Sequence, residues 1–360
     1  MTGPVLITAG GTGGHMFPAL ALGRALTKRG RAVTLLTDSR GARYVGSDLP
    51  FTVVSAGSPS GGVAATVKGI LQLAGGLVQS LAALRRVRPA VAASFGGYAS
   101  VPAALAAAFG RVPVLVHEQN AVFGRANRLT ARFAQAVALS FERTVAVPER
   151  PGLRRLVTGN PTRPEFADPP TVQPAPGRFR VLVLGGSQGA RVFSDVVPGA
   201  VALLPPELRS RLELAQQCRP EDLERVRAAY AAIGFPAELA SFFTDIPTRM
   251  AAVDLLVSRS GASTVAELVA LGRPSLLVPY QHAADDHQTA NARALAEAGA
   301  AIVVPQQAFT VDRFADDLAA LMRDPSRLAA MADQARRLAR PDAVDRLVDA
   351  VLELAKERRP

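Results

Sequence analysis

The sequence predicts an α/β protein made of two Rossmann-like, doubly wound domains, each with a parallel sheet. The chain has 360 residues, of which 49% are hydrophobic, so it is long and apolar enough for two cores. Short apolar runs alternate with helical patterns throughout. Each half also opens in the same way, with a strand, a glycine-rich turn and a helix.

The first half begins with a predicted strand at Pro4–Thr8, followed by a glycine loop and a helix over Phe17–Arg29. Further strands are predicted at Ala32–Thr37, Val91–Ser94 and Val112–His117. Continuous apolar strands that alternate with helices are typical of a parallel sheet covered on both faces.

Residues 164–178 contain five prolines and no periodicity, which predicts a linker. The helical stretch over residues 310–359 is interrupted at Pro325 and Pro341. We therefore expect domains over residues 1–163 and 164–341, with a helix over 342–360 that returns to the first domain. Ligands are expected at the carboxyl ends of the strands. The strands predicted after the linker are Phe179–Leu184, Leu212–Gln216, Asp254–Ser258 and Ser275–Pro279.

The net positive charge of the chain comes entirely from its first half. Residues 1–160 carry 18 Lys and Arg against 5 Asp and Glu, whereas residues 161–360 carry 23 against 25. This asymmetry predicts either an anionic membrane surface or nucleic acid as a partner. Nucleic acid is disfavoured because aromatic residues make up only 5% and no recognition module is present.

Cysteine content and segment hydrophobicity indicate the compartment. A single cysteine, Cys218, allows no internal disulfide and fits a reducing environment. The first residues lack the features of a signal peptide, and we find no uninterrupted run of about 20 apolar residues. The sequence therefore predicts a soluble or peripheral cytosolic protein.

The loop Gly10–His15 stands between a predicted strand and a predicted helix. Its glycines allow close backbone approach, and the helix start offers N–H groups to a phosphate or pyrophosphate. A dinucleotide fingerprint would need glycine at position 16, which is Met16. Asp38 stands where a ribose-binding acid is expected, so a nucleotide-dependent oxidoreductase or epimerase remains an alternative.

The second glycine loop, Gly185–Arg191, follows another predicted strand. It matches the G-x-S-x-G pattern of a hydrolase nucleophile elbow at Ser187. Asp254 and either His282 or His287 follow in the order of a catalytic triad. A serine hydrolase is thus a second alternative, although it leaves the first domain without a role.

A third turn, Arg259–Thr264, precedes a helix predicted over Val265–Leu271. Ser263 and Thr264 are suited to donate to a diphosphate, and Glu267 to accept from ribose hydroxyls. Alternatively, Thr264 and Glu267 form only a capping box. The polar cluster His282–Asn291 suits sugar hydroxyls.

Seven segments in register resemble the MurG family of peptidoglycan N-acetylglucosaminyltransferases, which have the GT-B fold. They span residues 10–292 and are GGTGGH, FGGY, HEQN, GNPTR, GGSQGAR, RSGASTVAE and DDHQTANA. The resemblance implies inverting transfer of N-acetylglucosamine from UDP-GlcNAc to the C4 hydroxyl of the muramoyl sugar of lipid I, giving lipid II and UDP. It places the enzyme on the cytoplasmic face of the bacterial inner membrane.

The same resemblance implies roles for individual residues. The residues that line the cleft near the diphosphate and acceptor would be Thr12, Gly13 and Gly14. The backbone at Phe243, where the family has an aliphatic residue, would hold the uracil. Donor contacts would come from Asn120, Arg163, Ser187, Ala262, Ser263, Thr264, Glu267, Gln288 and Asn291.

Inverting transfer needs a base for the acceptor hydroxyl and stabilisation of the departing UDP. His15 is the candidate base, or alternatively a structural histidine, with His117 and Glu118 as other bases. No D-x-D motif is present, and Asp285 and Asp286 would diverge by about 100° on a helix. We therefore expect no obligate metal and no other cofactor.

Residues 63–88 combine an apolar face with flanking cations. This pattern suits an anionic bilayer, where a lipid-linked acceptor is found, or alternatively a pair of helices that face the core. The residues expected at the membrane are Val67, Lys68, Ile70, Leu71, Leu77, Leu81, Arg85 and Arg86.

Overall fold

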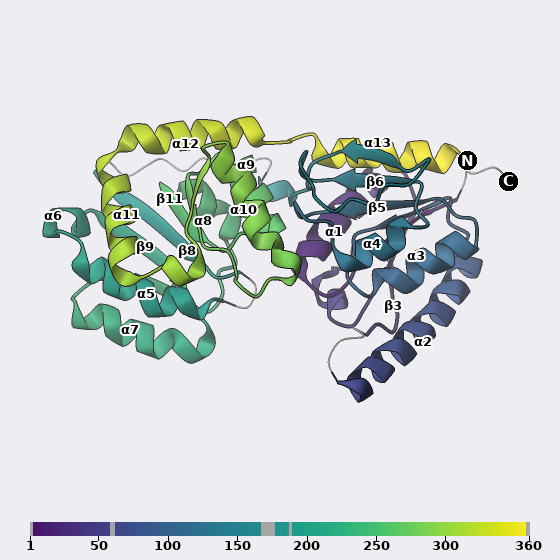
Figure 1. Ribbon diagram of the computed structural model, residues 1–360, viewed down its shortest axis with the longest axis horizontal. Coiled ribbons are helices and arrows are strands. Elements are labelled where there is room, and N and C mark those ends of the chain that lie inside the picture. The colour runs from purple at the N-terminus through teal and green to yellow at the C-terminus, as the bar shows by residue number, and fades with distance from the viewer. Residues whose placement is uncertain (1–2, 58–61, 167–176, 187–188, 358–360) are drawn as a thin grey trace. The chain divides into compact units, whose positions relative to one another are not determined.

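The computed structural model describes residues 3–57, 62–166, 177–186 and 189–357 (Figure 1). The chain divides into two units: unit 1 comprises Met1–Arg163 with Arg340–Pro360, and unit 2 comprises Pro164–Ala339. Each unit contains one wholly parallel sheet. The predicted fold class, two doubly wound α/β domains of the GT-B type, is confirmed.

Unit 1 contains a seven-stranded parallel sheet with the order β3-β2-β1-β4-β5-β6-β7. Chain order reverses at β1 and β4, which pair in register from Val5 with Val91 to Thr8 with Ser94. Crevices at such reversals are where ligands bind in doubly wound folds. The strands are β1 (Val5–Thr8), β2 (Val33–Thr37), β3 (Phe51–Val53), β4 (Val91–Ser94), β5 (Val114–Glu118), β6 (Ala136–Leu139) and β7 (Arg154–Val157).

Helices cover both faces of this sheet. Strand side chains alternate, so Val5 and Ile7 of β1 enter a core with α1 and α13, whereas Leu6 enters a second core with α2, α3 and α4. The last helix of the chain thus belongs to unit 1. The helices are α1 (Gly13–Lys28), η1 (Gly41–Tyr44), α2 (Val63–Val87), α3 (Ser100–Phe109), α4 (Arg125–Ala131) and α13 (Ala343–Lys356).

Unit 2 contains a six-stranded parallel sheet with the order β10-β9-β8-β11-β12-β13. Here β8 and β11 are the central pair. Val181 and Val183 of β8 enter a core with Phe193 and Phe314, and Leu182 on the opposite face is fully buried as well. The strands are β8 (Phe179–Leu184), β9 (Leu212–Gln217), β10 (Glu238–Ala240), β11 (Leu255–Ser258), β12 (Ser275–Leu277) and β13 (Ala301–Val303).

The start of α12 in unit 2 shows how a proline can begin a helix. The predicted interruption at Pro325 is confirmed, because α11 ends at Arg323 and Pro325 is the first residue of α12, where its fixed φ is favourable and its missing N–H is not needed. The helices are η2 (Pro164–Phe166), α5 (Arg191–Leu203), α6 (Pro206–Arg209), η3 (Pro220–Asp222), α7 (Leu223–Ala232), α8 (Ile246–Ala252), α9 (Ala262–Ala270), η4 (Ala284–Asp286), α10 (His287–Glu297), η5 (Gln306–Ala308), α11 (Val311–Arg323) and α12 (Pro325–Leu338).

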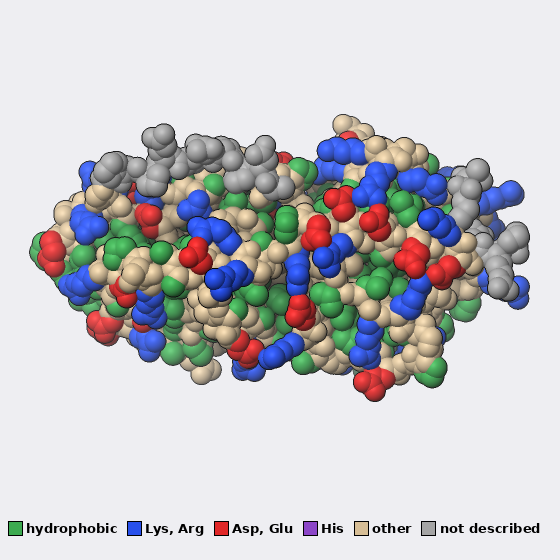
Figure 2. Space-filling view, turned by 90° about the horizontal axis from the view of Figure 1, so that it is seen from above, with side chains coloured by type: hydrophobic (Ala, Val, Ile, Leu, Met, Phe, Trp, Pro, Cys, Tyr) green, Lys and Arg blue, Asp and Glu red, His purple; other side chains and the backbone are tan. Residues whose placement is uncertain are grey.

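Charged side chains of both signs are interspersed on the face seen in Figure 2. In unit 1 they form ion pairs between α13 and its neighbours. Arg29 binds Asp345 and Asp349, and Arg154 binds Glu357. These pairs are exposed and each contributes at most about 1 kcal/mol, so α13 is held mainly by its apolar face.

Candidate active site

Four of the sequence motifs lie where strands of unit 1 end. GGTGGH follows β1, FGGY follows β4, HEQN spans the end of β5, and GNPTR follows β7. Because all these strands are parallel, their carboxyl ends share one edge of the sheet. The motifs therefore gather at the edge where doubly wound folds bind ligands.

The glycine loops GGTGGH, after β1, and FGGY, after β4, pack directly on one another. A Cβ atom on Gly10 would lie 2.3 Å from the Cβ of Ala99, and one on Gly97 would lie 2.6 Å from the carbonyl oxygen of Gly10. Gly97 also has a φ of +77°. Only glycine allows this approach, so these positions are explained by loop packing as well as by any ligand.

Asp38 fastens the first loop instead of standing free for a ribose. Its carboxylate accepts hydrogen bonds from the N–H groups of Gly11 (3.0 Å) and Gly41 (2.8 Å) and from the Arg40 guanidinium. Burial alone would raise the pKa of Asp38, but these three donors outweigh it and lower the pKa. Met16 is fully buried in the core. A dinucleotide site is therefore disfavoured, because Asp38 already has partners and the position of the third glycine is occupied by a buried methionine.

The first turn of α1 presents several of the predicted residues. Thr12 is the exposed N-cap and makes no capping hydrogen bond with its side chain, and Gly13 and Gly14 are the first helical residues. His15 is half-buried, with Nδ1 2.9 Å from Oε1 of Gln119. Among the residues that the structure describes, its Nε2 has no hydrogen-bond partner. This nitrogen is thus open to a substrate proton.

The two alternative bases are enclosed. His117 is fully buried, and its Nε2 donates to the carbonyl of Gly159 at 3.1 Å. Burial, aided by nearby His15, lowers the pKa of His117 to about 4. Glu118 is 1% exposed, and its two oxygens accept four hydrogen bonds. In this structure neither side chain is accessible to an acceptor hydroxyl.

The predicted donor contacts of unit 1 have partners within the unit. Asn120 donates from its backbone and side-chain nitrogens to Oε1 of Glu118, at 3.0 and 3.1 Å. The guanidinium of Arg163 lies 5.0 Å from the ring centre of Phe17, on α1. This cation–π contact places Arg163 against the same helix that carries His15.

In unit 2, glycine loops again follow central strands. The loop after β8 contains Gly186 and Gly189, both with positive φ, and N–H of Gly185 donates to Gln217. Ser187 lies outside the described residues. After β11, Gly261 is the N-cap of α9, and the cap has no side-chain hydrogen bond.

The helix of the third turn begins earlier than expected. Because α9 starts at Ala262, Thr264 is its third residue and not its N-cap, so the predicted capping box is wrong. The Oγ of Ser263 is buried and has no partner in the described part of the chain. The first-turn N–H groups lack partners within the helix. These donors suit an anion, as expected for Ala262, Ser263 and Thr264, and Glu267 is buried farther along the helix.

The polar cluster after β12 is tied to this turn. The Oγ of Ser260 donates to the carbonyl of Gln288, and Nδ2 of Asn291 donates to the carbonyl of Ser260 at 3.0 Å. Oε1 of Gln288 accepts from the N–H of Tyr280. Asn291 has no exposed surface, so its direct contact with a sugar stays a prediction. Phe243 is buried beneath the guanidinium of Arg249, 4.2 Å from its ring centre.

Arg259 is a residue of this region that the sequence pattern did not single out. Its guanidinium donates to the carbonyls of Val278 and Pro279 and to Oε1 of Gln306. Burial lowers its pKa to about 10, still well above neutrality. A buried cation thus holds the ends of β11 and β12 together. Its signals in the sequence are that it directly follows a buried strand and that it begins the RSGASTVAE segment.

The proposed Ser-Asp-His triad is contradicted by the position of Asp254. Oδ2 of Asp254 accepts from the N–H of Arg180, which lies at the start of β8. Ser187 follows the other end of β8, beyond Leu184. At about 3.3 Å per strand residue the two ends of β8 are more than about 12 Å apart, so Asp254 lies at the opposite end of β8 from Gly185, where the second glycine loop begins.

Asp285 and Asp286 differ from the regular helix assumed for them. Both have left-handed backbone conformations, with φ of 52° and 50°, and they precede α10. Their carboxylates therefore need not diverge by about 100°, as they would on a regular helix. The described residues contain no group of three or more His, Cys, Asp or Glu side chains arranged to hold a metal.

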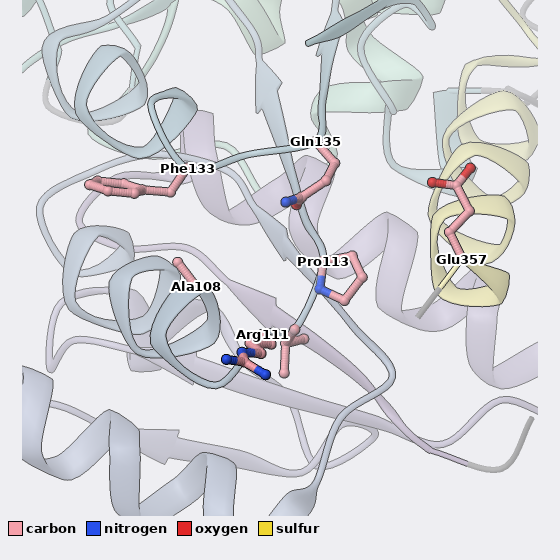
Figure 3. A pocket seen from close by; sticks show the side chains of 7 residues that line it. Ala108, Arg111, Pro113, Phe133, Gln135 and Glu357 are labelled. Carbon is pink, nitrogen blue, oxygen red and sulfur yellow. The ribbon is translucent and has the colours of Figure 1, made fainter. Parts of the chain in front are cut away.

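A hollow in unit 1 lies away from these motifs (Figure 3). It is lined by residues that precede β5 and β6, including Pro113 and Gln135, and by Glu357 after α13. Gln135 accepts from the N–H of Val114, and Glu357 binds Arg154. Gln135 and Glu357 therefore already have partners within unit 1.

The helix α2 packs through one face and exposes another. Ala83 and Leu84 are buried, and Leu77 and Leu81 pack against the same core, which corrects the expectation that these two leucines face a membrane. A Cβ on Gly76 would lie 2.1 Å from the carbonyl of Ser55, so small residues let the helix approach closely. Its N-terminal part extends away from the rest of the unit (Figure 1).

The exposed large hydrophobic residues of α2 form one stripe. At about 100° per residue they fall within about 100° of the helix surface. Lys68, Arg85 and Arg86 are exposed as well. By length and composition α2 is apolar enough to cross a membrane, contrary to our expectation, which counted only uninterrupted apolar residues. Core helices pass the same test. The stripe consists of Val63, Val67, Ile70, Leu71 and Val78.

Comparison with known proteins gives the family. The N-terminal domain of glycosyltransferase family 28 matches residues 5–139, and its C-terminal domain matches residues 180–347. A Rhodospirillum rubrum protein is 50% identical over 99% of this chain and 93% of its own length. It is a UDP-N-acetylglucosamine–N-acetylmuramyl-(pentapeptide) pyrophosphoryl-undecaprenol N-acetylglucosamine transferase. The chain belongs to the MurG family, within glycosyltransferase family 28.

Other relatives agree with this assignment. A Rhodospirillum centenum protein of the same name is 48% identical over 97% of this chain and 94% of its own. The crystal structure of Acinetobacter baumannii MurG superposes with a TM-score of 0.79 and 28% identity, covering 97% of this chain and 99% of that one. The MurG family assignment makes this chain a glycosyltransferase, and the hydrolase and oxidoreductase alternatives are not favoured.

Proposed function

We propose that this chain transfers N-acetylglucosamine from UDP-GlcNAc to the C4 hydroxyl of the muramoyl sugar of lipid I, giving lipid II and UDP with inversion. The full-length similarity to MurG-family transferases carries the proposal. The loops after β8 and β11 would bind the donor, because each combines glycines with the start of a helix, where backbone N–H groups and the helix dipole favour a phosphate. The Gly10–His15 loop of unit 1 would face the acceptor and the leaving diphosphate.

The roles of individual residues follow from what each presents. Asn120 and Arg163 of unit 1, with Ser187, Ala262–Thr264 and Gln288 of unit 2, would contact the donor. Helix starts and Arg163 would stabilise the departing UDP without an obligate metal or other cofactor. His15 would take the acceptor proton. Phe243 would hold the uracil through its backbone, and Asn291 would support the sugar site.

Glu267 gives the sharpest test of donor binding. A carboxylate that accepts two ribose hydroxyls contributes about 1.5–3 kcal/mol, since hydrogen bonds to charged groups are strong. Replacing Glu267 with alanine is therefore expected to raise the KM for UDP-GlcNAc about 10- to 100-fold, measured with a lipid I analogue. Glu207→Ala, on the exposed side of α6, is the matched control and should leave it unchanged.

The whole proposal is tested by the wild-type reaction. Turnover of UDP-GlcNAc with release of UDP, dependent on the lipid I analogue, is the expected result. Hydrolysis without an acceptor, or fluorophosphonate labelling of Ser187, would contradict it in favour of a hydrolase. Calorimetric binding of NAD but not UDP would contradict it in favour of an oxidoreductase.

The exposed stripe of α2 supports peripheral attachment to the cytoplasmic face of an anionic inner membrane. We propose no nucleic acid partner. Ile70 and Leu71 are 54% and 66% exposed, and basic residues lie on the same helix. Each would bury apolar surface in the bilayer interface, while Lys68, Arg85 and Arg86 would approach anionic headgroups.

Replacing Ile70 and Leu71 with glutamate is expected to weaken binding to vesicles containing phosphatidylglycerol at least about tenfold, because apolar area is lost and charges repel. Co-sedimentation at several salt concentrations measures this. Leu203→Glu, at an exposed leucine of unit 2, is the control that should bind like the wild type. Equal binding of the double variant, or binding without salt dependence, would refute the membrane role of α2.

A further inference from the structure

Four groups in unit 1 form one chain of hydrogen bonds that ends at His15. The Nε2 of His117 lies 3.1 Å from the carbonyl oxygen of Gly159, after β7. The Nδ1 of His117 lies 2.9 Å from Nε2 of Gln119, and Oε1 of Gln119 lies 2.9 Å from Nδ1 of His15. The chain thus connects the end of β7, the end of β5 and the start of α1.

The positions of the protons follow from the carbonyl of Gly159, which can only accept a hydrogen bond. A carbonyl oxygen has no proton, so Nε2 of His117 must donate to Gly159. A neutral imidazole carries one proton, which leaves Nδ1 of His117 as an acceptor. The amide group of Gln119 that faces it must then be the NH₂, and the carbonyl of Gln119 faces His15. The Nδ1 of His15 therefore donates, and its Nε2 carries the lone pair.

Two further observations support this orientation. The Nε2 of Gln119 also lies 3.0 Å from the backbone carbonyl of His117, a second partner that only accepts. A flipped amide would place two acceptors together at both contacts. His117 is fully buried and its pKa is lowered to about 4, so the ring is neutral at physiological pH. Gln119 itself is only 1% exposed, which keeps water from replacing these bonds.

We infer that Gln119 is a positioning residue, which holds His15 in the Nδ1–H tautomer and so keeps the Nε2 lone pair directed to the substrate. The catalytic part of this inference rests on the proposed function. In the transfer, the acceptor oxygen bonds to the anomeric carbon while the bond to UDP breaks and UDP leaves with the electron pair. The acceptor proton moves to Nε2 of His15. Nδ1–H continues to donate to Gln119, so the hydrogen-bond chain needs no rearrangement.

The tautomers are measurable without substrate. The chain has only four histidines, so ¹⁵N-labelled histidine and one substitution per position assign every ring in NMR spectra. We expect Nδ1–H for His15 and Nε2–H for His117 in the wild-type protein. Gln119→Met has a similar size but no hydrogen bonds, so His15 should shift to a mixture that contains Nε2–H. Nε2–H for His15 in the wild type, or no shift in Gln119→Met, would overturn the inference.

Activity provides the second readout. Gln119→Met is expected to lower kcat about 10- to 100-fold with little change in the KM for UDP-GlcNAc, because second partners set the orientation and tautomer of a histidine. Gln119→Glu still accepts from His15, so it should keep the Nδ1–H tautomer and recover part of kcat, while His117 gains a second proton. An equal loss in both variants would indicate a merely structural role and overturn the inference.

The two levels of the proposal fail in different ways. If the tautomers are as inferred but a His15 variant keeps its activity, the proposed base is wrong and the positioning by Gln119 stands. If Gln119→Met does not fold, Nε2–H for His15 in the wild-type protein would still overturn the inference, and the signals of His282 and His287 report whether unit 2 stays folded.

Discussion

Replacing His15 with alanine is expected to lower kcat about 100- to 10,000-fold, the range typical of the loss of a general base. The change should appear at saturating UDP-GlcNAc and lipid I analogue. The KM for the donor should change little, because His15 lies in unit 1 and has no proposed role in binding the nucleotide. The physical reason is that the Nε2 of His15 has no hydrogen-bond partner among the described residues, while Nδ1 is held by Gln119.

His15→Asn separates chemistry from structure. The side-chain nitrogen of asparagine takes the place of Nδ1 and preserves the hydrogen bond to Gln119, but nothing replaces Nε2. If His15 is the base, the alanine and asparagine variants lose comparable activity. Recovery of kcat in His15→Asn would show that only the hydrogen bond is needed. Alanine activity near that of the wild type would remove His15 from the mechanism.

Central strands with continuous apolar sequence were predictable, and edge strands were not. The predicted bounds of Val91–Ser94 and Phe179–Leu184 match β4 and β8, which are buried on both faces. β7 (Arg154–Val157) begins with two arginines and was missed, because one side of an edge strand is solvent-exposed. β6 (Ala136–Leu139) was missed as well, although it lies inside the sheet and all four of its residues are buried.

The candidate site was predictable to the extent that its motifs follow central strands. Parallel topology brings such loops to one edge, so the grouping of GGTGGH with HEQN needed no coordinates. The hydrogen-bond partners of each side chain could be identified only from the coordinates. The orientation of the Gln119 amide depends, through His117, on the carbonyl of Gly159. That carbonyl is 40 residues away and follows a strand that was not predicted. Similarly, the capping box failed because α9 starts two residues before Thr264, which a local pattern does not determine.

Glu118 is expected to be essential to the stability of unit 1 and not to the chemistry. Its buried carboxylate accepts from the backbone N–H groups of Asn120 and Gly124 and from the side-chain nitrogens of Asn120 and Asn127. It thereby fastens the loop between β5 and α4. Removing it takes one acceptor away from each of these donors, at a cost of about 1–3 kcal/mol for each buried group that neither water nor another acceptor reaches.

Glu118→Ala is therefore expected to destabilise unit 1 by about 3–5 kcal/mol, and Glu118→Gln, which keeps one accepting oxygen, by less. Because two-unit chains need not unfold in one step, hydrogen exchange of β5 and β6 amides is the appropriate measurement. Glu142→Ala is the control, since its exposed pair with Arg340 contributes under about 1 kcal/mol. A Glu118→Gln protein with wild-type exchange but greatly reduced kcat would instead return Glu118 to the list of candidate bases. Loss of stability with kcat retained in the folded fraction would leave that role to His15.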